Sequence, residues 1–297
     1  MIQYLKLIRT SQWIKNIFVF APLFFSNGLF NKEQTMATFL TFLSFCFISS
    51  SIYCLNDLHD AEADRQHPQK CKRPIASGAV STRNGYITMM LCALMSFCIL
   101  VLVNSPKLTY LYIIIGGYWL MNVAYCLKLK HYAIIDVTII AIGFVLRVLA
   151  GGFATDTWVS HWLVLMTFLL ALLLAFTKRY DDFSIYEQTG TKPRVSITGY
   201  NKAFINEATA IVAAITMVCY IMYTMSEEVM VRMGTHYLYL TSGWVLAGIL
   251  RYLQNMIVYN QSGSPTKSLM EDRFTQFCIV GWIISFFTIL YIKILQF

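Results

Sequence analysis

Three carboxylates at helical spacing give the 297-residue chain its clearest chemical signal. Asp57, Asp60 and Asp64 are separated by three and then four residues, so a helix through them would place all three on one face. Stacked carboxylates repel one another unless a cation neutralises them. Carboxylate oxygens suit Mg²⁺, whose remaining positions go to phosphate oxygens and water. The spacing therefore predicts a magnesium site. The competing interpretation is a solvated charged loop with internal ion pairs.

A basic run follows these carboxylates and favours the metal interpretation. Lys70, Lys72 and Arg73 come directly before Pro74. Lys and Arg bind phosphate oxygens through charge-assisted hydrogen bonds. Cations next to metal-binding carboxylates are therefore what a metal–diphosphate would require, and the segment predicts a site of that kind.

The elements that must position this site are apolar helices. Hydrophobic residues make up 57% of the chain and charged residues only 13%, against about 25% charged in soluble domains. Nine segments are apolar enough to cross a bilayer: 14–30, 36–55, 85–103, 108–127, 132–150, 158–176, 205–225, 236–256 and 275–296. The predicted fold is therefore an all-α, polytopic membrane protein of nine transmembrane helices, forming a single transmembrane domain over residues 1–297. The first segment is short, and we expect it to be tilted or broken at Pro22.

The basic residues are sorted between the two sides that nine crossings create. The side of the N-terminus has 17 of the 23 Lys and Arg, namely residues 6, 9, 15, 65, 70, 72, 73, 83, 128, 130, 178, 179, 192, 194, 202, 267 and 273. The other side has 32, 107, 232 and 293, while 147 and 251 fall within segments. The positive-inside rule then places the N-terminus in the cytoplasm and the C-terminus across the membrane. The net charge of +8 is thereby explained without a nucleic-acid partner.

The long polar loops 56–84, 177–204 and 257–274 fall on the same cytoplasmic side, which predicts a site opening to the cytoplasm. A transporter would instead need polar gates on both sides. The short, charge-poor loops on the far side argue against that class.

Two groups of polar residues lie within or next to apolar segments. Asp136 and Arg147 are 11 residues apart, so they share a helix face at a separation of about 16 Å. Arg147 then lies near mid-membrane, where it either binds a substrate phosphate or pairs with a carboxylate of another span. Lys15 and Asn16 begin the first segment. They are either phosphate contacts or an ordinary interfacial anchor.

The segment Asn56-Asp57-x-x-Asp60-x-x-x-Asp64, followed by Lys72-Arg73-Pro74-Ile75, resembles the first Asp-rich motif of the UbiA-type intramembrane prenyltransferase superfamily. Further stretches resemble its decaprenyl-phosphate phosphoribosyltransferase branch. They are Arg9 to Asn16 with Val19 to Pro22, Asp64-Arg65-x-His67-Pro68, Arg73 to Gly78, Leu146 to Gly152, Lys178-Arg179-Tyr180, Pro265 and Asp272-Arg273. The resemblance implies a UbiA-like bundle with cytoplasmic cap loops, and Mg²⁺ held by Asp57, Asp60 and Asp64.

One departure helps to choose the branch. Quinone- and haem-forming members have a second motif, roughly DxxxD, after the sixth span. This chain instead has Lys178-Arg179-Tyr180 followed by Asp181 and Asp182. Cations suit a donor with a phosphate beyond its diphosphate, such as phosphoribosyl pyrophosphate. Whether Asp181 or Asp182 holds a second metal stays open.

The resemblance implies Mg²⁺-dependent transfer of 5-phosphoribose from phosphoribosyl pyrophosphate to a polyprenyl phosphate at a bacterial inner membrane, with release of pyrophosphate. The implied substrate-binding residues are Lys15, Asn16, Asn56, Lys70, Lys72, Arg73, Asp136, Arg147, Lys178, Arg179 and Tyr180. The alternative is transfer of a polyprenyl group from its diphosphate to an aromatic acceptor on the same fold. A homo-oligomer is compatible with either, and the sequence leaves the lipid's length open.

Overall fold

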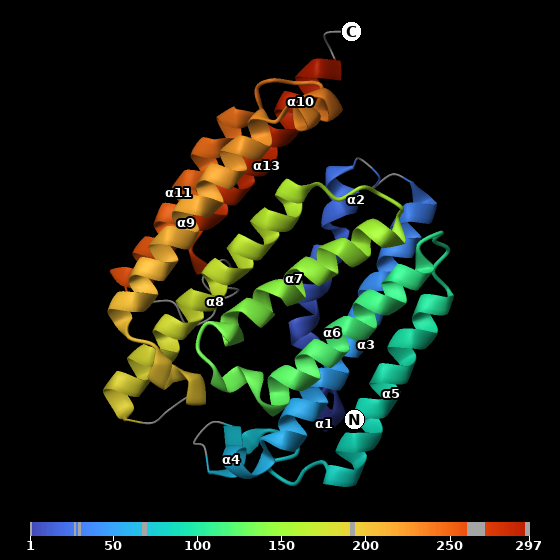
Figure 1. The fold of residues 1–297 in the computed structure, drawn as a ribbon, viewed down its shortest axis with the longest axis vertical. Helices are drawn as coiled ribbons and strands as arrows, with labels where there is room; N and C mark the ends of the chain where they lie inside the picture. Colours follow the sequence, from blue (N-terminus) through green and yellow to red (C-terminus); the bar gives the residue numbers. More distant parts are fainter. Residues whose placement is uncertain are drawn as a thin grey trace. The chain divides into compact units, whose positions relative to one another are not determined.

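A computed structural model describes residues 2–26, 28, 31–66, 70–190, 194–259 and 271–294, whose regular elements are helices, with no strand among them. The predicted all-α class is therefore confirmed for the described part of the chain (Figure 1). Contacts divide the chain into two compact units, Met1–Ser160 and His161–Phe297. Each unit is described by itself, and a single domain over 1–297 stays a prediction.

The described residues of the first unit form ten helical elements. They are α1 (Ile2–Leu7), the 3-10 helix η1 (Thr10–Phe20), α2 (Ala21–Phe25), α3 (Lys32–His59), α4 (Ala61–Arg65), η3 (Lys70–Lys72), α5 (Thr82–Val101), α6 (Leu108–Leu127), η4 (Leu129–His131) and α7 (Ile135–Ala154).

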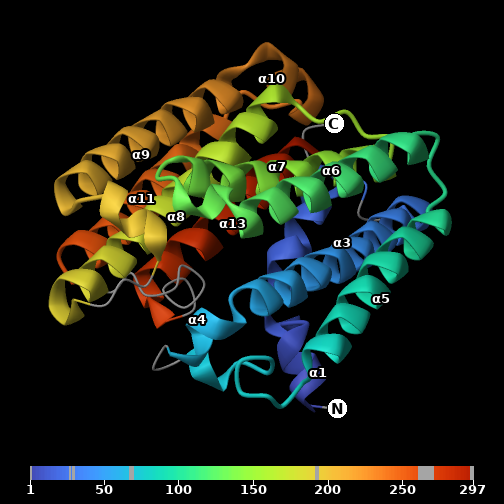
Figure 2. The same ribbon diagram turned by 60° about the horizontal axis from the view of Figure 1, so that its bottom comes forward.

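The long helix α3 is the centre of this unit. It starts where the Asn31 side chain accepts hydrogen bonds from the backbone N–H groups of Glu33 and Gln34, which satisfies donors that the first turn leaves unpaired. It packs along α5 and also against α6, α7 and η1, and Figures 1 and 2 both show α5 beside it.

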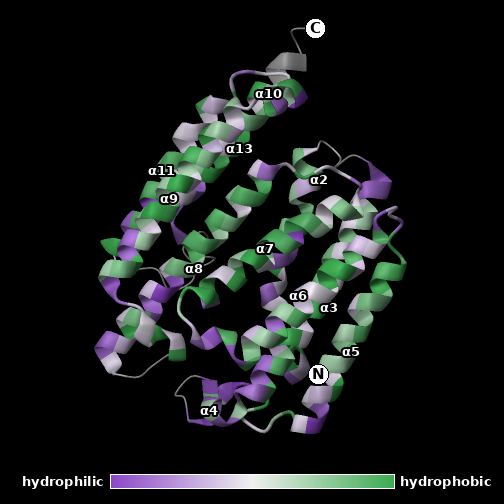
Figure 3. Ribbon diagram, viewed as in Figure 1, coloured by the Kyte–Doolittle hydropathy of each residue, from purple (hydrophilic) through white to green (hydrophobic). Residues whose placement is uncertain are grey.

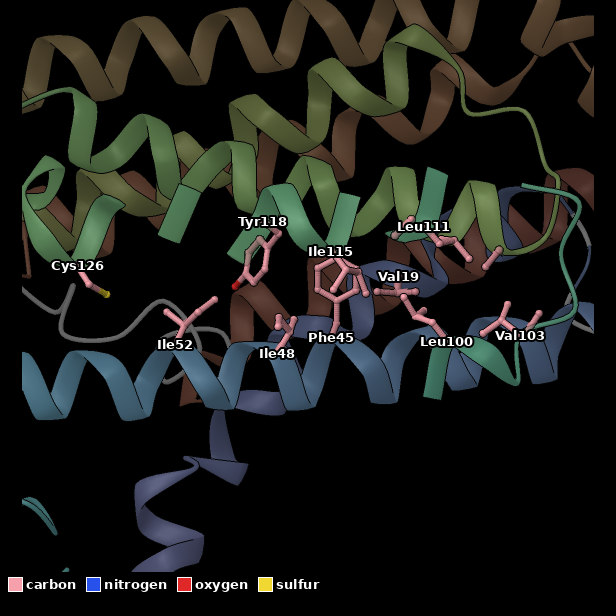
Figure 4. Close-up of a cluster of buried hydrophobic side chains, with 13 residues drawn as sticks. Val19, Phe45, Ile48, Ile52, Leu100, Val103, Leu111, Ile115, Tyr118 and Cys126 are labelled. Carbon is pink, nitrogen blue, oxygen red and sulfur yellow. The ribbon is translucent and has the colours of Figure 1, made fainter. Parts of the chain in front are cut away.

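The core between α3 and α6 is apolar. Phe45 and Ile48 of α3 are fully buried, as are Leu111 and Ile115 of α6. Figure 4 shows these side chains meeting between the two helices. This packing holds α3, whose last turn carries Asp57, against its neighbouring helices.

The first predicted segment, 14–30, is not one continuous helix. The 3-10 helix η1 ends at Phe20, and α2 begins with Ala21 and Pro22. Proline is tolerated in a first turn because its missing N–H would have no partner there. The element is therefore broken next to Pro22, as expected.

A glycine of α7 lets η1 approach closely. A Cβ atom at Gly151 would overlap the backbone carbonyl of Val19. Only glycine permits this contact between η1 and α7, which holds Asn16 of η1 next to Arg147 of α7.

The second unit contains α8 (His161–Thr189), η5 (Val195–Gly199), α9 (Lys202–Met225), α10 (Glu227–Met233), η6 (Leu238–Thr241), α11 (Ser242–Ile257) and α13 (Arg273–Ile294). Helix α8 runs 13 residues beyond its predicted end at 176, so the expected loop there is partly wrong. The helix ends at Thr189 and is followed by Gly190, whose φ of +67° is the left-handed conformation that favours glycine after a helix.

Six described helices are long and apolar enough to cross a membrane: α3, α5, α6, α7, α8 and α9. Helix α11 is shorter, and the described apolar part of α13 covers Arg273–Ile289. Figure 3 shows hydrophobic residues along the helix shafts and a concentration of hydrophilic ones at α4. The chain is therefore a multi-pass membrane protein, and nine crossings stay a prediction.

Candidate active site

The Asp motif lies where α3 gives way to α4. Helix α3 ends at His59, and Asp60 has a backbone outside the regular helix (φ −92°, ψ 4°) before α4 starts at Ala61. The predicted uninterrupted helix through all three carboxylates is therefore wrong. The turns stay linked, because the N–H of Asp60 donates to Asn56 and the N–H of Asp64 donates to Asp60. Asp57 and Asp64 share a cation that Asp60, at the break, does not contact in the described part of the chain.

Asp57 and Asp64 converge on one guanidinium. Nη1 of Arg73 lies 2.6 Å from Oδ2 of Asp64 and 3.3 Å from Oδ1 of Asp57. Both carboxylates are buried, with 2% and 4% of their surface exposed. Arg9, which precedes η1, donates from Nη2 to the same Asp57 oxygen at 2.5 Å. The result is a partly buried cluster of two anions and two cations.

Asp60 has a different cation. Nζ of Lys130, in η4, donates to its Oδ1 at 2.6 Å, and the neighbouring His59 ring lies 3.0 Å from the same oxygen. Burial alone raises the pKa of the Asp60 carboxyl, but the bonds from Lys130 and His59 outweigh it and hold this pKa below its ordinary value. Asp60 is thus a stable anion on the η4 side of the motif.

The residues of the basic run, Lys70, Lys72 and Arg73, differ in their contacts with the Asp motif. Within the described contacts, Arg73 makes the ion pairs to the motif, while Lys72 is exposed and Lys70 is half-buried in the short turn η3. The Asn56 side-chain oxygen faces the thiol of Cys126 at 3.8 Å. His67 and Pro68 lie outside the described residues.

The donor chemistry at Asp57 and Asp64 fits a hard divalent cation. Among the residues described, no group of three or more His, Cys, Asp or Glu side chains is arranged to hold a metal. Mg²⁺, however, is commonly bound by one or two carboxylates together with substrate phosphates and water. Two buried carboxylates that already converge on a single cationic nitrogen meet that requirement. Participation of Asp60 stays a prediction.

Arg147 forms a second polar cluster, deep within α7. Its guanidinium donates to the Asn16 side chain at 2.7 Å, to the Gly143 carbonyl at 2.7 Å and to the Tyr118 hydroxyl at 2.8 Å. Only 6% of its surface is exposed. The pairing with a carboxylate of another span is not found among the described residues, because all three partners are neutral.

Asp136 and Lys15, the remaining predicted site residues of this unit, lie on α7 and η1. Asp136 is fully buried in the first turn of α7, so it shares the buried side of that helix with Arg147 as predicted. Lys15 is half-buried in η1, one residue before the buried Asn16.

Lys178, Arg179 and Tyr180 belong to helix α8, not to a loop. Arg179 is fully buried and donates to Asp182 at 2.9 Å, and Arg194 pairs with the same carboxylate at 3.0 Å. Tyr180 is buried and Lys178 exposed. Their role in substrate binding stays a prediction.

Sequence reasoning missed Arg9 and Lys130 as members of the site. Both were counted only as charges on the cytoplasmic side. Arg9 is 48 residues from Asp57 and Lys130 is 70 residues from Asp60. No local spacing connects residues so far apart. The one local signal was the position of Arg9 at the start of the N-terminal resemblance.

Comparison with known proteins agrees with this arrangement. The model of the UbiA prenyltransferase family matches residues 17–274. A decaprenyl-phosphate phosphoribosyltransferase from Mycolicibacterium smegmatis is 34% identical over 94% of this chain and 89% of its own length. One from Corynebacterium glutamicum is 30% identical over 97% and 86%.

Solved structures show the same fold at lower identity. A UbiA homolog from Archaeoglobus fulgidus bound to GPP and Mg²⁺ has a TM-score of 0.69 at 19% identity, covering 97% of this chain and 99% of that one. An apo UbiA homolog from Aeropyrum pernix has a TM-score of 0.67 at 16% identity, covering 93% and 97%. The chain is therefore a multi-pass membrane transferase that belongs to the UbiA prenyltransferase family.

Proposed function

We propose that the protein transfers 5-phosphoribose from phosphoribosyl pyrophosphate to a polyprenyl phosphate and releases pyrophosphate. The names of its relatives support this reaction. The structural observation that carries it is the convergence of buried Asp57 and Asp64 on Arg73, with Arg9 next to them. This cluster combines the carboxylates and guanidinium groups that a metal-bound diphosphate needs.

The chain's own residues would act on the leaving group. Arg73 and Arg9 would exchange part of their bonding to the carboxylates for bonds to diphosphate oxygens, and so stabilise charge that grows as the bond from ribose C1 to the pyrophosphate oxygen breaks. Asp57 and Asp64 would hold Mg²⁺, which when bound adds positive charge at the leaving pyrophosphate. An oxygen of the lipid phosphate forms the new bond to C1. That oxygen is already anionic, so no general base is required.

Arg147 is the proposed contact for the acceptor phosphate. A guanidinium has five N–H donors, and three of those of Arg147 have acceptors among the described residues. Two remain, on a cation that has no carboxylate partner in the described part of the chain. An anionic ligand would supply the missing counter-charge. Arg147→Met should therefore reduce affinity for the lipid substrate, and a stable Arg147→Met protein with unchanged turnover would refute this role.

The proposed setting is a bacterial inner membrane crossed nine times. The 17 basic residues on the N-terminal side, against four on the other, support an N-terminus and Asp motif in the cytoplasm. A water-soluble donor would then reach the motif from the cytoplasm, while the lipid acceptor arrives within the bilayer.

Donor binding tests the reaction class. Equilibrium dialysis of the purified protein against labelled phosphoribosyl pyrophosphate should show saturable, Mg²⁺-dependent binding. Arg73→Met should weaken this binding by about tenfold, because it removes the charged donor shared by both carboxylates. Lys107→Met, which removes an exposed pair with Asp156, is the control. Failure to bind this donor, together with tight binding of a prenyl diphosphate, would favour prenyl transfer instead.

A further inference from the structure

Tyr53 is an unassigned residue on the side of α3 that faces the candidate site. It precedes Asp57 by four residues, so the two side chains are neighbours on one helix face. One turn of helix, about 5.4 Å, separates their positions along the axis. Tyr53 therefore lies one helical turn from Asp57 toward the middle of α3.

The Tyr53 ring supports Arg9. The Arg9 guanidinium carbon lies 4.8 Å from the ring centroid, within the range of a cation–π contact. Arg9 has a left-handed backbone conformation (φ 50°, ψ 54°), which is uncommon for a residue other than glycine. Such a conformation persists only where the surroundings hold it. The ring of Tyr53 and the carboxylate of Asp57 are the two groups that hold the Arg9 side chain.

The Tyr53 hydroxyl has no hydrogen-bond partner within the described part of the chain, although the side chain is half-buried. Other phenols of the interior are bonded. Tyr118 accepts from Arg147, Tyr220 bonds to Thr241 and Tyr252 bonds to Thr177. Phenolic hydroxyls normally find partners when they are removed from water. Among the described residues, the Tyr53 hydroxyl thus has no partner of its own and can donate to a ligand next to the cluster.

The Arg9 guanidinium contacts the Tyr53 ring, and Arg147 interacts with the same side chain electrostatically without a described contact. An anion bound against Tyr53 would therefore meet the positive charge of Arg9, with Arg147 of α7 adding to it. Its position one turn inward from Asp57 separates this point from the diphosphate cluster.

We propose that the Tyr53 hydroxyl donates a hydrogen bond to the phosphate of the polyprenyl acceptor, while its ring positions Arg9. This inference rests on the proposed phosphoribosyl transfer. It assigns one side chain two separable roles, because the hydroxyl serves the lipid phosphate and the ring serves a guanidinium at the donor.

Steady-state kinetics of Tyr53→Phe and Tyr53→Leu separate the two roles. Tyr53→Phe keeps the ring, so the KM for polyprenyl phosphate should rise about tenfold while the KM for phosphoribosyl pyrophosphate stays within about twofold. Tyr53→Leu also removes the ring, so both KM values should rise. Tyr86→Phe removes an exposed hydroxyl of α5 and should change neither. Thermal unfolding of each variant controls for folding, and Tyr53→Phe decides alone if the leucine variant is unstable.

The outcomes distinguish the two levels of the proposal. Wild-type protein that forms no lipid-linked phosphoribose would overturn the proposed function and this inference with it. Wild-type activity combined with an unchanged acceptor KM in Tyr53→Phe would overturn the hydroxyl's role alone. An equal rise in both KM values in Tyr53→Phe would also contradict it, because the ring is retained in that variant.

Discussion

At the scale of single residues, Arg73 joins the candidate site together, because one of its nitrogens contacts the two buried carboxylates of Asp57 and Asp64. The carboxylates and the basic run could be identified from spacing alone. Their pairing could not, since the turn at Asp60 separates Asp60 from Asp57 and Asp64. An argument from spacing assumes a continuous helix. Here the helix is interrupted at Asp60, which forms an ion pair with Lys130 instead.

Removing one charge from the converging pair should abolish most of the activity. Asp57→Asn and Asp64→Asn should each lower turnover by about 100-fold or more, because the amide can no longer carry the negative charge that holds a cation. Initial rates with both substrates saturating measure the effect. Asp156→Asn, whose carboxylate pairs with Lys107 at an exposed position, is the matched control. Activity of Asp57→Asn within about threefold of wild type would exclude this carboxylate from the chemistry.

The neutral partners of Arg147 illustrate another limit of residue-scale prediction. An intramembrane arginine can be recognised from sequence as either functional or paired. Its actual acceptors, Asn16 and Tyr118, come from η1 and α6. Neither carries a charge, so no charge-matching argument could have chosen them.

Elements were predicted best where apolar length alone determines them. Helix α6 spans Leu108–Leu127, as the hydrophobic segment indicated. Helix α8 was predicted too short because its last turns are polar, whereas an i,i+3 pair between Arg179 and Asp182 accompanies the continuing helix. The first segment differs, since it is a 3-10 helix that packs against both α3 and α7, which apolar length does not reveal.

The approach of η1 to α7 gives a test at the level of elements. Gly151→Ala should reduce the free energy of unfolding by about 1–3 kcal/mol, because its methyl group would overlap the Val19 carbonyl. Gly117→Ala in α6 is the control, since a Cβ there meets nothing within 4 Å. Thermal unfolding in detergent should show a lower Tm for the first variant only. Equal Tm values would mean that η1 does not pack this closely.

An ion pair between α11 and the start of α13 gives a pH test. Hydrogen bonds from Arg251 hold the pKa of the Asp272 carboxyl well below its ordinary value of 3.8, with smaller help from Thr275 and against a modest opposing effect of burial. A carboxyl whose pKa is lowered by folding stabilises the fold above its ordinary pKa, and the contribution is lost as pH falls through the folded value.

Asp272→Asn should therefore lower Tm by the same amount at pH 8 and pH 5, and the difference should shrink only below about pH 4. Thermal unfolding of both proteins across this range measures it. A difference that already disappears between pH 8 and pH 6 would show that another group controls this contact. Arg251, which the sequence indicates to be structural because no motif surrounds it, forms this ion pair.

At the scale of the whole molecule, the sorted basic residues predict a topology. A reporter active only in the cytoplasm should function when inserted after Gly78, within the 56–84 loop, and fail when fused to the C-terminus. Nine crossings place these two points on opposite sides. Activity at both points would require an even number of crossings between them and would contradict the proposed count.

Family membership and helical class followed from composition and one motif because both depend on features local in sequence. The local structure of the second unit was less predictable. Lys178 and Arg179 lie within helix α8, whereas the hydrophobic segment predicted a helix end at residue 176. Substrate identity depends on side chains from several elements, so it is best tested by measuring which substrates the purified protein converts.

The most direct measurement is transfer of label by the purified protein with Mg²⁺. Labelled phosphoribosyl pyrophosphate and polyprenyl phosphate should yield a lipid-extractable, phosphoribosylated product, whereas prenyl diphosphate and an aromatic acceptor should yield none. The Asp57→Asn protein should form little of the first product. Prenylated aromatic product without any lipid-linked phosphoribose would contradict the central claim.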